Sequence, residues 1–394
     1  MSLIRSSRPA LFAITLLAAT WSGVTAPATA AGAEKHPKAT TVLSKAKAKA
    51  AAANKHKVAK KAPRAPAPVA SVADSEAVNF REWSAVQQFE DEMVAAHGFD
   101  RAALDTLFSQ ARLLETAVQL VKPAPPGKPK NWQAYSSRFI EPIRINAGVR
   151  FWNENADTLA RAERTYGVPA EILVGIIGVE TVYGRDTGRF RVIDTLTTLA
   201  FAYPEAPNRT ERMAFFRGEL ENTLVLAQHA GVDPFSLLGS FAGAVGLPQF
   251  MPGSILKWGV DFDNDGRVDL RNSVADAIGS VANFLVEHGW KRDATGPAVY
   301  AAQVAPSRAW EGFLGKGLVA TYRPEELTAA GVTTAAAVPS DRLYGLVDLQ
   351  NGADATEYWL ASDNFFAITN YNRSYFYAMS VIDLGRAVRI TRGL

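Results

Sequence analysis

The sequence predicts a mainly helical α+β protein that contains a small antiparallel sheet near its carboxyl end. Apolar residues recur at helical spacing through most of the segment between residues 80 and 290. From Gly296 to Ile368 this pattern gives way to short runs rich in Val, Tyr and Thr, which are typical of strands. The chain has 394 residues, of which 48% are hydrophobic and 21% charged, so it can bury a substantial core. The composition therefore excludes a wholly disordered or fibrous protein.

The first 30 residues are typical of a cleavable export signal. Arg5 and Arg8 precede an apolar run over residues 10–19, and residues 28–30 supply the small side chains that signal peptidase requires. The alternative is a membrane anchor, but the run is shorter than the ~20 residues needed to cross a bilayer. The chain contains no cysteine, so a lipid cannot be attached through one. We therefore expect a periplasmic protein that is not lipid-anchored.

Residues 31–75 are predicted to form a disordered basic tail rich in Lys, Ala and Pro. Nine Lys and Arg64 face a single acidic residue between positions 31 and 70, which gives this part a net charge of +9, whereas residues 71–394 carry −8. Two interpretations of the tail stay open. It can hold the protein at an anionic surface of the envelope, or it can serve as a solvated spacer. The basic charge lies outside the folded body, so it does not indicate a nucleic-acid partner.

The folded body is predicted to have a helical region over 76–295, a β-rich region over 296–370 and a closing helix over 371–394. Apolar periodicity and glycine or proline breaks define the individual helices. The predicted helices are two between Phe80 and Leu120, one from Asn146 to Tyr166, one opening at Pro169, and one each over 209–230, 273–288 and Tyr375 to Ile390. A proline-rich connector is predicted over 122–130.

Glu180 is the first candidate catalytic residue. It follows Ile176 by one turn on an apolar stripe, where a core residue would be expected. Burial and the negative end of the helix dipole both disfavour a carboxylate there, so its pKa is predicted to be raised. A carboxyl group that is protonated near neutral pH can act as a general acid. The alternative is a structural ion pair between Glu180 and Arg185 or Arg191.

The segment over 240–252 is the second candidate. It contains two Gly, two Pro and Gln249 among apolar residues, a composition that lets the backbone approach a ligand closely. Ser240 and Gln249 are the candidate hydrogen-bonding groups. The alternative is a tight helix crossing in which small residues only permit contact. The segment does not match a glycine-rich phosphate-binding motif.

A third segment resembles a calcium-binding EF-hand loop. Positions 1, 3, 5 and 9 of the loop carry carboxylates and position 6 carries the glycine of the sharp turn. These residues are Asp261, Asp263, Asp265, Asp269 and Gly266. Position 12 is Asn272 in place of the usual Glu, although Asp276 could supply a ligand from the next helix. The alternative is a polar turn without metal. The five His are scattered and cysteine is absent, which makes a zinc site unexpected.

Several separated segments, in this order, together resemble the lytic murein transglycosylase B family. The similarity covers about residues 80–394, and it is carried by 148–152, 180–185, 240–252, the Asp-rich loop with 276–283, and 371–379. This resemblance implies a lysozyme-like helical core with a small sheet domain beside a long groove. It also implies cleavage of the bond between N-acetylmuramic acid and N-acetylglucosamine in peptidoglycan.

The resemblance also implies a role for each matching residue. Glu180 is the single catalytic acid and base. The residues implied to bind sugars in the groove are Ser240, Gln249, Tyr371, Asn372 and Tyr377. The implied ligands of a structural calcium ion are Asp261, Asp263, Asp265, Arg267 through its carbonyl, and Asp276. The spacing from Asp265 to Asp276 is one residue longer than the family's usual pattern. No organic cofactor is expected.

A single carboxylate implies a reaction different from ordinary glycoside hydrolysis, which uses two. Glu180 would protonate the glycosidic oxygen and then remove a proton from the sugar's own 6-hydroxyl, leaving a 1,6-anhydro ring. Two alternatives stay open. A hydrolytic lysozyme would need a second carboxylate or a positioned water, whereas a non-catalytic calcium-stabilised glycan-binding protein would tolerate loss of Glu180.

Overall fold

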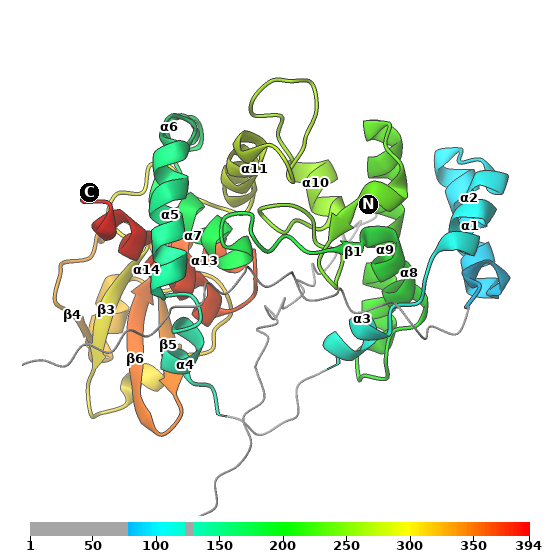
Figure 1. Cartoon of the computed structure of the whole chain (residues 1–394). Helices are drawn as coiled ribbons and strands as arrows, with labels where there is room; N and C mark the ends of the chain where they lie inside the picture. Colours follow the sequence, from blue (N-terminus) through cyan, green and yellow to red (C-terminus); the bar gives the residue numbers. More distant parts are fainter. Residues whose placement is uncertain (1–77, 123–128) are drawn as a thin grey trace, which may run out of the picture. The chain divides into compact units, whose positions relative to one another are not determined.

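The computed structural model describes residues 78–122 and 129–394, which belong to one compact unit (Figure 1). The export signal predicted for residues 1–30 and the basic tail predicted for residues 31–75 lie outside the described residues. Most of the predicted connector lies outside them as well. Within the described ranges, no helix is both long and apolar enough to cross a membrane.

The amino-terminal part of the folded body holds one more helix than the two predicted. Gly98 ends the first helix in a left-handed conformation with φ 69°. The second break comes from distant hydrogen bonds, because the Arg112 amide donates to Asp194 (3.0 Å) and the Leu114 amide donates to Thr198 (3.0 Å). Apolar periodicity does not report such bonds. The elements are a 3₁₀ turn (Phe80–Glu82), α1 (Ser84–His97), α2 (Arg101–Gln110) and α3 (Glu115–Leu120).

The next region corrects the prediction of one helix over 146–166. Asn155 interrupts it with φ −119° and ψ 23°, and its side-chain amide donates to the Phe151 carbonyl (2.8 Å). The following helix ends at Gly167, as predicted. Pro169 stands at the N-cap of the helix after that, one position before its first turn. The helices are α4 (Trp132–Ser136), α5 (Pro142–Glu154), α6 (Ala156–Tyr166) and α7 (Ala170–Thr181).

The helices predicted over 209–230 and 273–288 are confirmed, the second within one residue at each end. A pair of two-residue antiparallel strands, which was not predicted, joins the segment after α7 to the segment after α9. The elements are β1 (Phe190–Arg191), α8 (Val192–Phe201), α9 (Arg209–Ala230), a 3₁₀ turn (Pro234–Ser236), β2 (Leu238–Gly239), α10 (Pro252–Trp258) and α11 (Val274–Glu287).

The predicted antiparallel sheet is confirmed, with four strands in the order β4-β3-β6-β5 (Figure 1). Leu346 pairs with Leu360 in its longest ladder. The region is less purely β than predicted, because it also contains helices. One of them holds an apolar run that is buried on all sides, a pattern that a strand and a helix share. The elements are β3 (Val299–Val304), a 3₁₀ turn (Ala309–Phe313), α12 (Pro324–Ala329), β4 (Val332–Thr334), β5 (Gly345–Asn351), β6 (Asp354–Ala361) and α13 (Asp363–Thr369).

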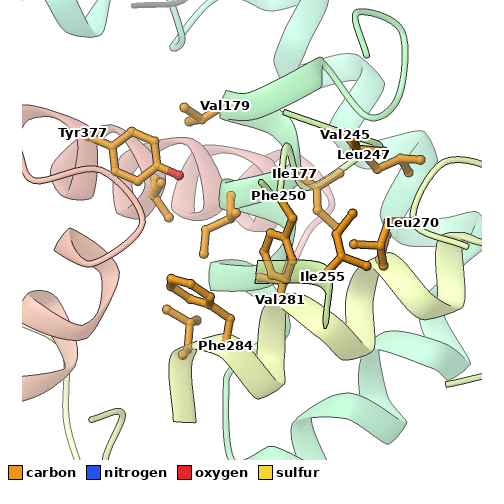
Figure 2. Close-up of a cluster of buried hydrophobic side chains, with 14 of the residues drawn as sticks. Ile177, Val179, Val245, Leu247, Phe250, Ile255, Leu270, Val281, Phe284 and Tyr377 are labelled. Carbon is orange, nitrogen blue, oxygen red and sulfur yellow. The ribbon is translucent and has the colours of Figure 1, made fainter. Parts of the chain in front are cut away.

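The predicted closing helix is α14 (Tyr375–Thr391), which packs directly against α7 (Figure 1). Two glycines permit this contact. A Cβ atom on Gly175 would lie 2.2 Å from the Val381 carbonyl oxygen, and one on Gly385 would lie 2.1 Å from the Glu171 carbonyl oxygen. Apolar side chains from α7, α10, α11 and the segment over 240–252 complete the core beside them (Figure 2). These contacts fix α7 against α14 on one side and against the core beside them on the other.

Candidate functional site

Glu180 lies in the last turn of α7, one residue before the helix ends. Val182 (φ 51°) and Tyr183 (φ 59°) follow in left-handed conformations that turn the chain away. Thr181 fixes this turn, since its hydroxyl donates to the Leu247 carbonyl (2.8 Å) and accepts from the Gly184 amide (3.0 Å). The carboxyl group is therefore carried on a rigid helix end that is bonded to the segment over 240–252.

The Glu180 side chain is partly buried and has one hydrogen-bond partner from α14. The Tyr377 hydroxyl donates to Glu180 Oε1 at 2.6 Å, and Tyr377 itself is only 2% exposed. Burial raises the pKa of Glu180 from its ordinary value to about 7, although the hydrogen bond from Tyr377 acts in the opposite direction. The raised pKa predicted from the apolar stripe is confirmed. The group can hold or release a proton near neutral pH.

The alternative interpretation of Glu180 as an ion-pair partner is wrong. Arg185 binds the neighbouring Asp186 at 2.8 Å, and Arg191 binds Asp194 at 2.6 Å. Both guanidinium groups are thus engaged with aspartates. Neither contributes to the shift in the pKa of Glu180.

The C-terminal segment reaches the same place as Glu180, as the resemblance implied. The Tyr371 hydroxyl donates to the Pro248 carbonyl (2.8 Å), and its ring stacks on Tyr377 with centroids 6.2 Å apart and planes at 12°. Asn372 follows Tyr371 and is buried, with a side-chain oxygen that has no hydrogen-bond partner among the described residues. A buried acceptor without a partner is costly, so this oxygen is suited to receive a ligand's donor.

Ser240 and Gln249 hold the shape of their segment in this structure. The amides of Ala242 (3.3 Å) and Ala244 (3.1 Å) donate to Ser240 Oγ. Gln249 has φ 52°, and its side-chain amide donates to the carbonyls of Thr187 (3.2 Å) and Gly246 (2.9 Å). Both side chains therefore order a tight loop.

Gly246 of that loop lies where two backbone segments approach each other closely. A Cβ atom on Gly246 would lie 2.3 Å from the Leu270 carbonyl oxygen, while the adjacent Leu247 amide donates to the same oxygen at 2.8 Å. The contact joins two loops and is not the helix crossing considered from the sequence. It also links the segment over 240–252 to the Asp-rich loop.

Tyr135 of α4 is a residue of the site that sequence reasoning missed. Burial raises its pKa to about 12, and the negative charge of Glu180 is the next cause. The ring packs against Trp132, Phe139 and Phe376. The spacing of the aromatic residues over 132–139 could have indicated that Tyr135 belongs to the site, but the same spacing is equally typical of a core helix.

The Asp-rich loop brings three carboxylates together. One oxygen each of Asp261, Asp263 and Asp276 lies within 4.8 Å of the other two. Asp276 reaches the loop from the first turn of α11 and is 1% exposed, and it accepts from the amides of Phe262 (2.7 Å) and Asp269 (2.8 Å). Hard oxygen donors that converge around a sharp turn are the set that calcium prefers, so the residues present fit this ion.

The other residues predicted as ligands have different partners in the loop. The Arg267 amide donates to Asp265 (2.9 Å), and the Arg267 guanidinium pairs with the same carboxylate at 3.4 Å. Asp269 accepts from the amides of Arg271 (3.0 Å) and Asn272 (2.9 Å). Partial burial opposes the shift, but hydrogen bonds from Asn272 leave the pKa of Asp269 lowered. Asp265 and Asp269 are not members of the convergent group of three.

Comparison with known proteins identifies close relatives over the folded body. The family model for the transglycosylase SLT domain matches residues 80–386. Membrane-bound lytic murein transglycosylase B from Escherichia coli (strain K12) is 44% identical over 316 residues, which cover 78% of this chain and 83% of that protein.

Solved structures agree with this result. The Escherichia coli lytic transglycosylase Slt35 in complex with calcium matches with a TM-score of 0.71 and 40% identity, covering 80% of this chain and 96% of that one. SltB3 from Pseudomonas aeruginosa, in complex with NAG-anhNAM-pentapeptide, matches with a TM-score of 0.64 and 27% identity over 77% of this chain and 79% of that one. The mainly helical, lysozyme-like fold class is confirmed by these neighbours. The chain therefore belongs to the transglycosylase SLT family and is a lytic murein transglycosylase of the B type.

Proposed function

We propose that this enzyme cleaves the bond between N-acetylmuramic acid and N-acetylglucosamine in peptide-bearing peptidoglycan, with Glu180 as its single general acid and base. The observation that carries the proposal is the Glu180 carboxyl group, partly buried at the end of α7 and hydrogen-bonded to Tyr377. Its pKa of about 7 leaves it protonated in a large fraction of molecules at neutral pH. The complex of SltB3 with a muropeptide supports the choice of substrate.

The reaction begins with transfer of the Glu180 proton to the glycosidic oxygen. The bond from this oxygen to the muramic acid breaks, and the sugar's own N-acetyl group stabilises the positive charge that develops on the ring. Glu180 is now a carboxylate, a form that the hydrogen bond from Tyr377 favours. It removes the proton of the 6-hydroxyl, whose oxygen closes the 1,6-anhydro ring. Glu180 regains its proton, and no water is consumed.

The surroundings of Glu180 favour this reaction over hydrolysis. A retaining glycosidase places a second carboxylate ~5 Å from the first. In the described part of the chain, no carboxylate contributes to the shift in the pKa of Glu180. Mass spectrometry of digested peptidoglycan tests the proposal, because the anhydro product is lighter by one water than a reducing end. Products that carry reducing ends would make the enzyme a hydrolase.

We further propose a structural calcium ion in the Asp-rich loop, a proposal supported by the calcium complex of Slt35. Asp261, Asp263 and Asp276 would hold it, together with Asp265 and the Arg267 carbonyl. The ion would neutralise converging carboxylates. The loop is hydrogen-bonded to the segment over 240–252 through Leu270, so a stabilised loop would also stabilise that side of the site.

We propose a periplasmic location and a role for the basic tail in binding anionic envelope material. Both proposals are supported by the sequence of residues 1–75, with its export-signal pattern and its excess of Lys. A variant that lacks residues 31–75 should keep its activity on short soluble glycans and lose salt-sensitive binding to isolated sacculi. Equal binding by both proteins at low and high salt would show that the tail is only a spacer.

A further inference from the structure

A hollow of about 400 Å³ lies beside the four-stranded sheet, and none of its residues belongs to the site described above. It is bordered by strands β5 and β6, the 3₁₀ turn Ala309–Phe313 and residues 129–130. The polar side chains that line it are those of Lys130, Glu311, Asp348, Gln350, Thr356 and Tyr358, and Trp310 lines it as well.

One wall of the hollow combines an aromatic ring with a carboxylate. Tyr358 packs edge-on against Trp310, with ring centroids 4.9 Å apart. Asp348 is half-buried, accepts a hydrogen bond from Gln350 (2.8 Å) and forms no salt bridge within the described ranges, whereas Glu311 pairs with Arg308. Asp348 and Tyr358 are direct partners across β5 and β6, and an aromatic ring beside an uncompensated carboxylate is an environment that suits an ammonium group.

The electrostatics of Tyr358 agree with this description. Burial is the largest cause of its raised pKa, the negative charges of Asp348 and Glu311 come next, and the positive charge of Arg308, which pairs with Glu311, acts in the opposite direction. Lys130 supplies the opposite charge at the other side of the hollow and is exposed. Its backbone is fixed there, since the Gly352 amide donates to the Lys130 carbonyl (2.9 Å). The hollow therefore presents one free carboxylate and one ammonium group.

The first three residues of α14 connect the hollow to Glu180. The charge of Asp348 contributes to the raised pKa of Tyr375, after burial. Phe376 packs against Trp132, two residues beyond Lys130, with centroids 5.4 Å apart. Tyr377 binds Glu180 directly. A substrate held at Glu180 thus lies at the same end of α14 as the hollow.

We propose that this hollow binds the peptide stem of peptidoglycan through an amino-acid end that carries a free ammonium and a carboxylate group. Asp348 and the ring of Tyr358 would hold the ammonium group, and Lys130 would hold the carboxylate. The inference rests on the proposed function, because only a peptide-bearing glycan offers such a group. It makes the sheet region a second point of contact with the substrate.

The test compares binding of three probes to the full-length protein by calorimetry. The probes are a disaccharide-tetrapeptide that contains diaminopimelate, the same compound with its free amine acetylated, and the disaccharide without peptide. Glu180→Gln serves as the background so that no probe is cleaved. Asp348→Asn should weaken binding of the first probe about fivefold, as expected for one partly exposed ion pair, and should leave the other two unchanged. The matched control is Asp354→Asn, which changes an exposed carboxylate at the first residue of β6 and should change none of the three.

Two outcomes would overturn the inference. One is equal affinity of Asp348→Asn and its parent for the free-amine probe, and the other is equal affinity of the parent for the free and acetylated probes. Neither outcome touches the proposed function, which is read from the anhydro products of peptidoglycan digested by the enzyme with Glu180 intact. Loss of that cleavage, with amine-dependent binding retained, would refute the proposed function and leave a peptide-binding protein.

Discussion

Two acidic sites in this molecule use carboxylates in opposite ways. At the end of α7, a single carboxyl group is partly buried and meets one hydroxyl, so burial favours its neutral form. In the Asp-rich loop, exposed Asp263, half-buried Asp261 and buried Asp276 converge, and backbone amides donate to them. Amide donors favour the charged form. The comparison teaches that a buried carboxyl group without other charges nearby is prepared as a proton donor, whereas converging carboxylates that accept from backbone amides are prepared as a cation site.

The largest effect should come from Glu180→Gln. Glutamine keeps the shape of the side chain and cannot deliver the proton, so turnover on peptidoglycan should fall at least ~10²-fold. Release of muropeptides, followed by chromatography, measures it. Glu154→Gln, at the exposed end of α5, is the matched control and should keep full activity. An active Glu180→Gln protein would remove Glu180 from the mechanism.

A comparison of the stability of Glu180→Gln with that of the parent protein tests the raised pKa of Glu180. The pKa of Glu180 rises from an ordinary value of 4.5 to about 7 on folding, so its protonation stabilises the folded state. This contribution is complete below pH 4.5 and is lost as the pH rises through 7. Thermal unfolding should therefore show that Glu180→Gln gains stability relative to the parent between pH 4.5 and pH 8. If the difference in stability between the two proteins is constant from pH 4.5 to pH 8, the pKa of Glu180 is not raised on folding.

Tyr377→Phe should have the next largest effect, a loss of about tenfold in turnover, because it removes a hydrogen bond to a charged group. That hydrogen bond lowers the pKa of Glu180, so its loss should raise the pKa further. Since the acid form starts the reaction, the alkaline fall in kcat/KM should move to higher pH. Tyr371→Phe, whose hydroxyl donates to Pro248, should leave the position of this fall unchanged. If the alkaline fall in kcat/KM of Tyr377→Phe moves to lower pH, the hydrogen bond from Tyr377 does not lower the pKa of Glu180.

The features that the sequence predicted well depend on local patterns. The 3.6-residue period of α11 was enough to place that helix within one residue at each end. The position of Glu180 on an apolar stripe was enough to predict the direction of its pKa shift. In both cases the physical cause lies within one helix.

The features that the sequence could not give depend on residues far apart in the chain. The bond between Tyr377 and Glu180 joins positions 197 apart, and the family resemblance implied Tyr377 only as a sugar-binding residue of the groove. The break between α2 and α3 is made by Asp194 and Thr198, which lie on another helix. The effect of the Glu180 charge on the pKa of Tyr135 also joins residues far apart in the chain. Local periodicity has no access to such contacts.

Calcium should produce a smaller but measurable effect. An ion that binds only the folded state adds ~2.7 kcal/mol at a concentration 100 times its Kd, so the Tm should rise by about 5 °C and fall on chelation. Asp263→Asn should abolish most of this rise while keeping the loop's own hydrogen bonds, since an amide can replace the carboxylate towards Asp265 and Ser273. Asp293→Asn, an exposed change outside the loop, is the control. A Tm that is insensitive to calcium would leave the loop as a polar turn.

The smallest effect, Asp269→Ala, separates ligands from residues that only order the loop. Asp269 accepts from two backbone amides in the turn before α11, so its loss should cost ~1 kcal/mol, as for a helix cap. Because its oxygens are not among the three that converge, the Tm should fall equally with and without calcium. Differential scanning calorimetry at both conditions measures the two shifts. If Asp269→Ala also abolishes the calcium-dependent rise in Tm, Asp269 is a ligand at position 9 of the loop. The ion would then bind more residues than the three carboxylates that converge in this structure.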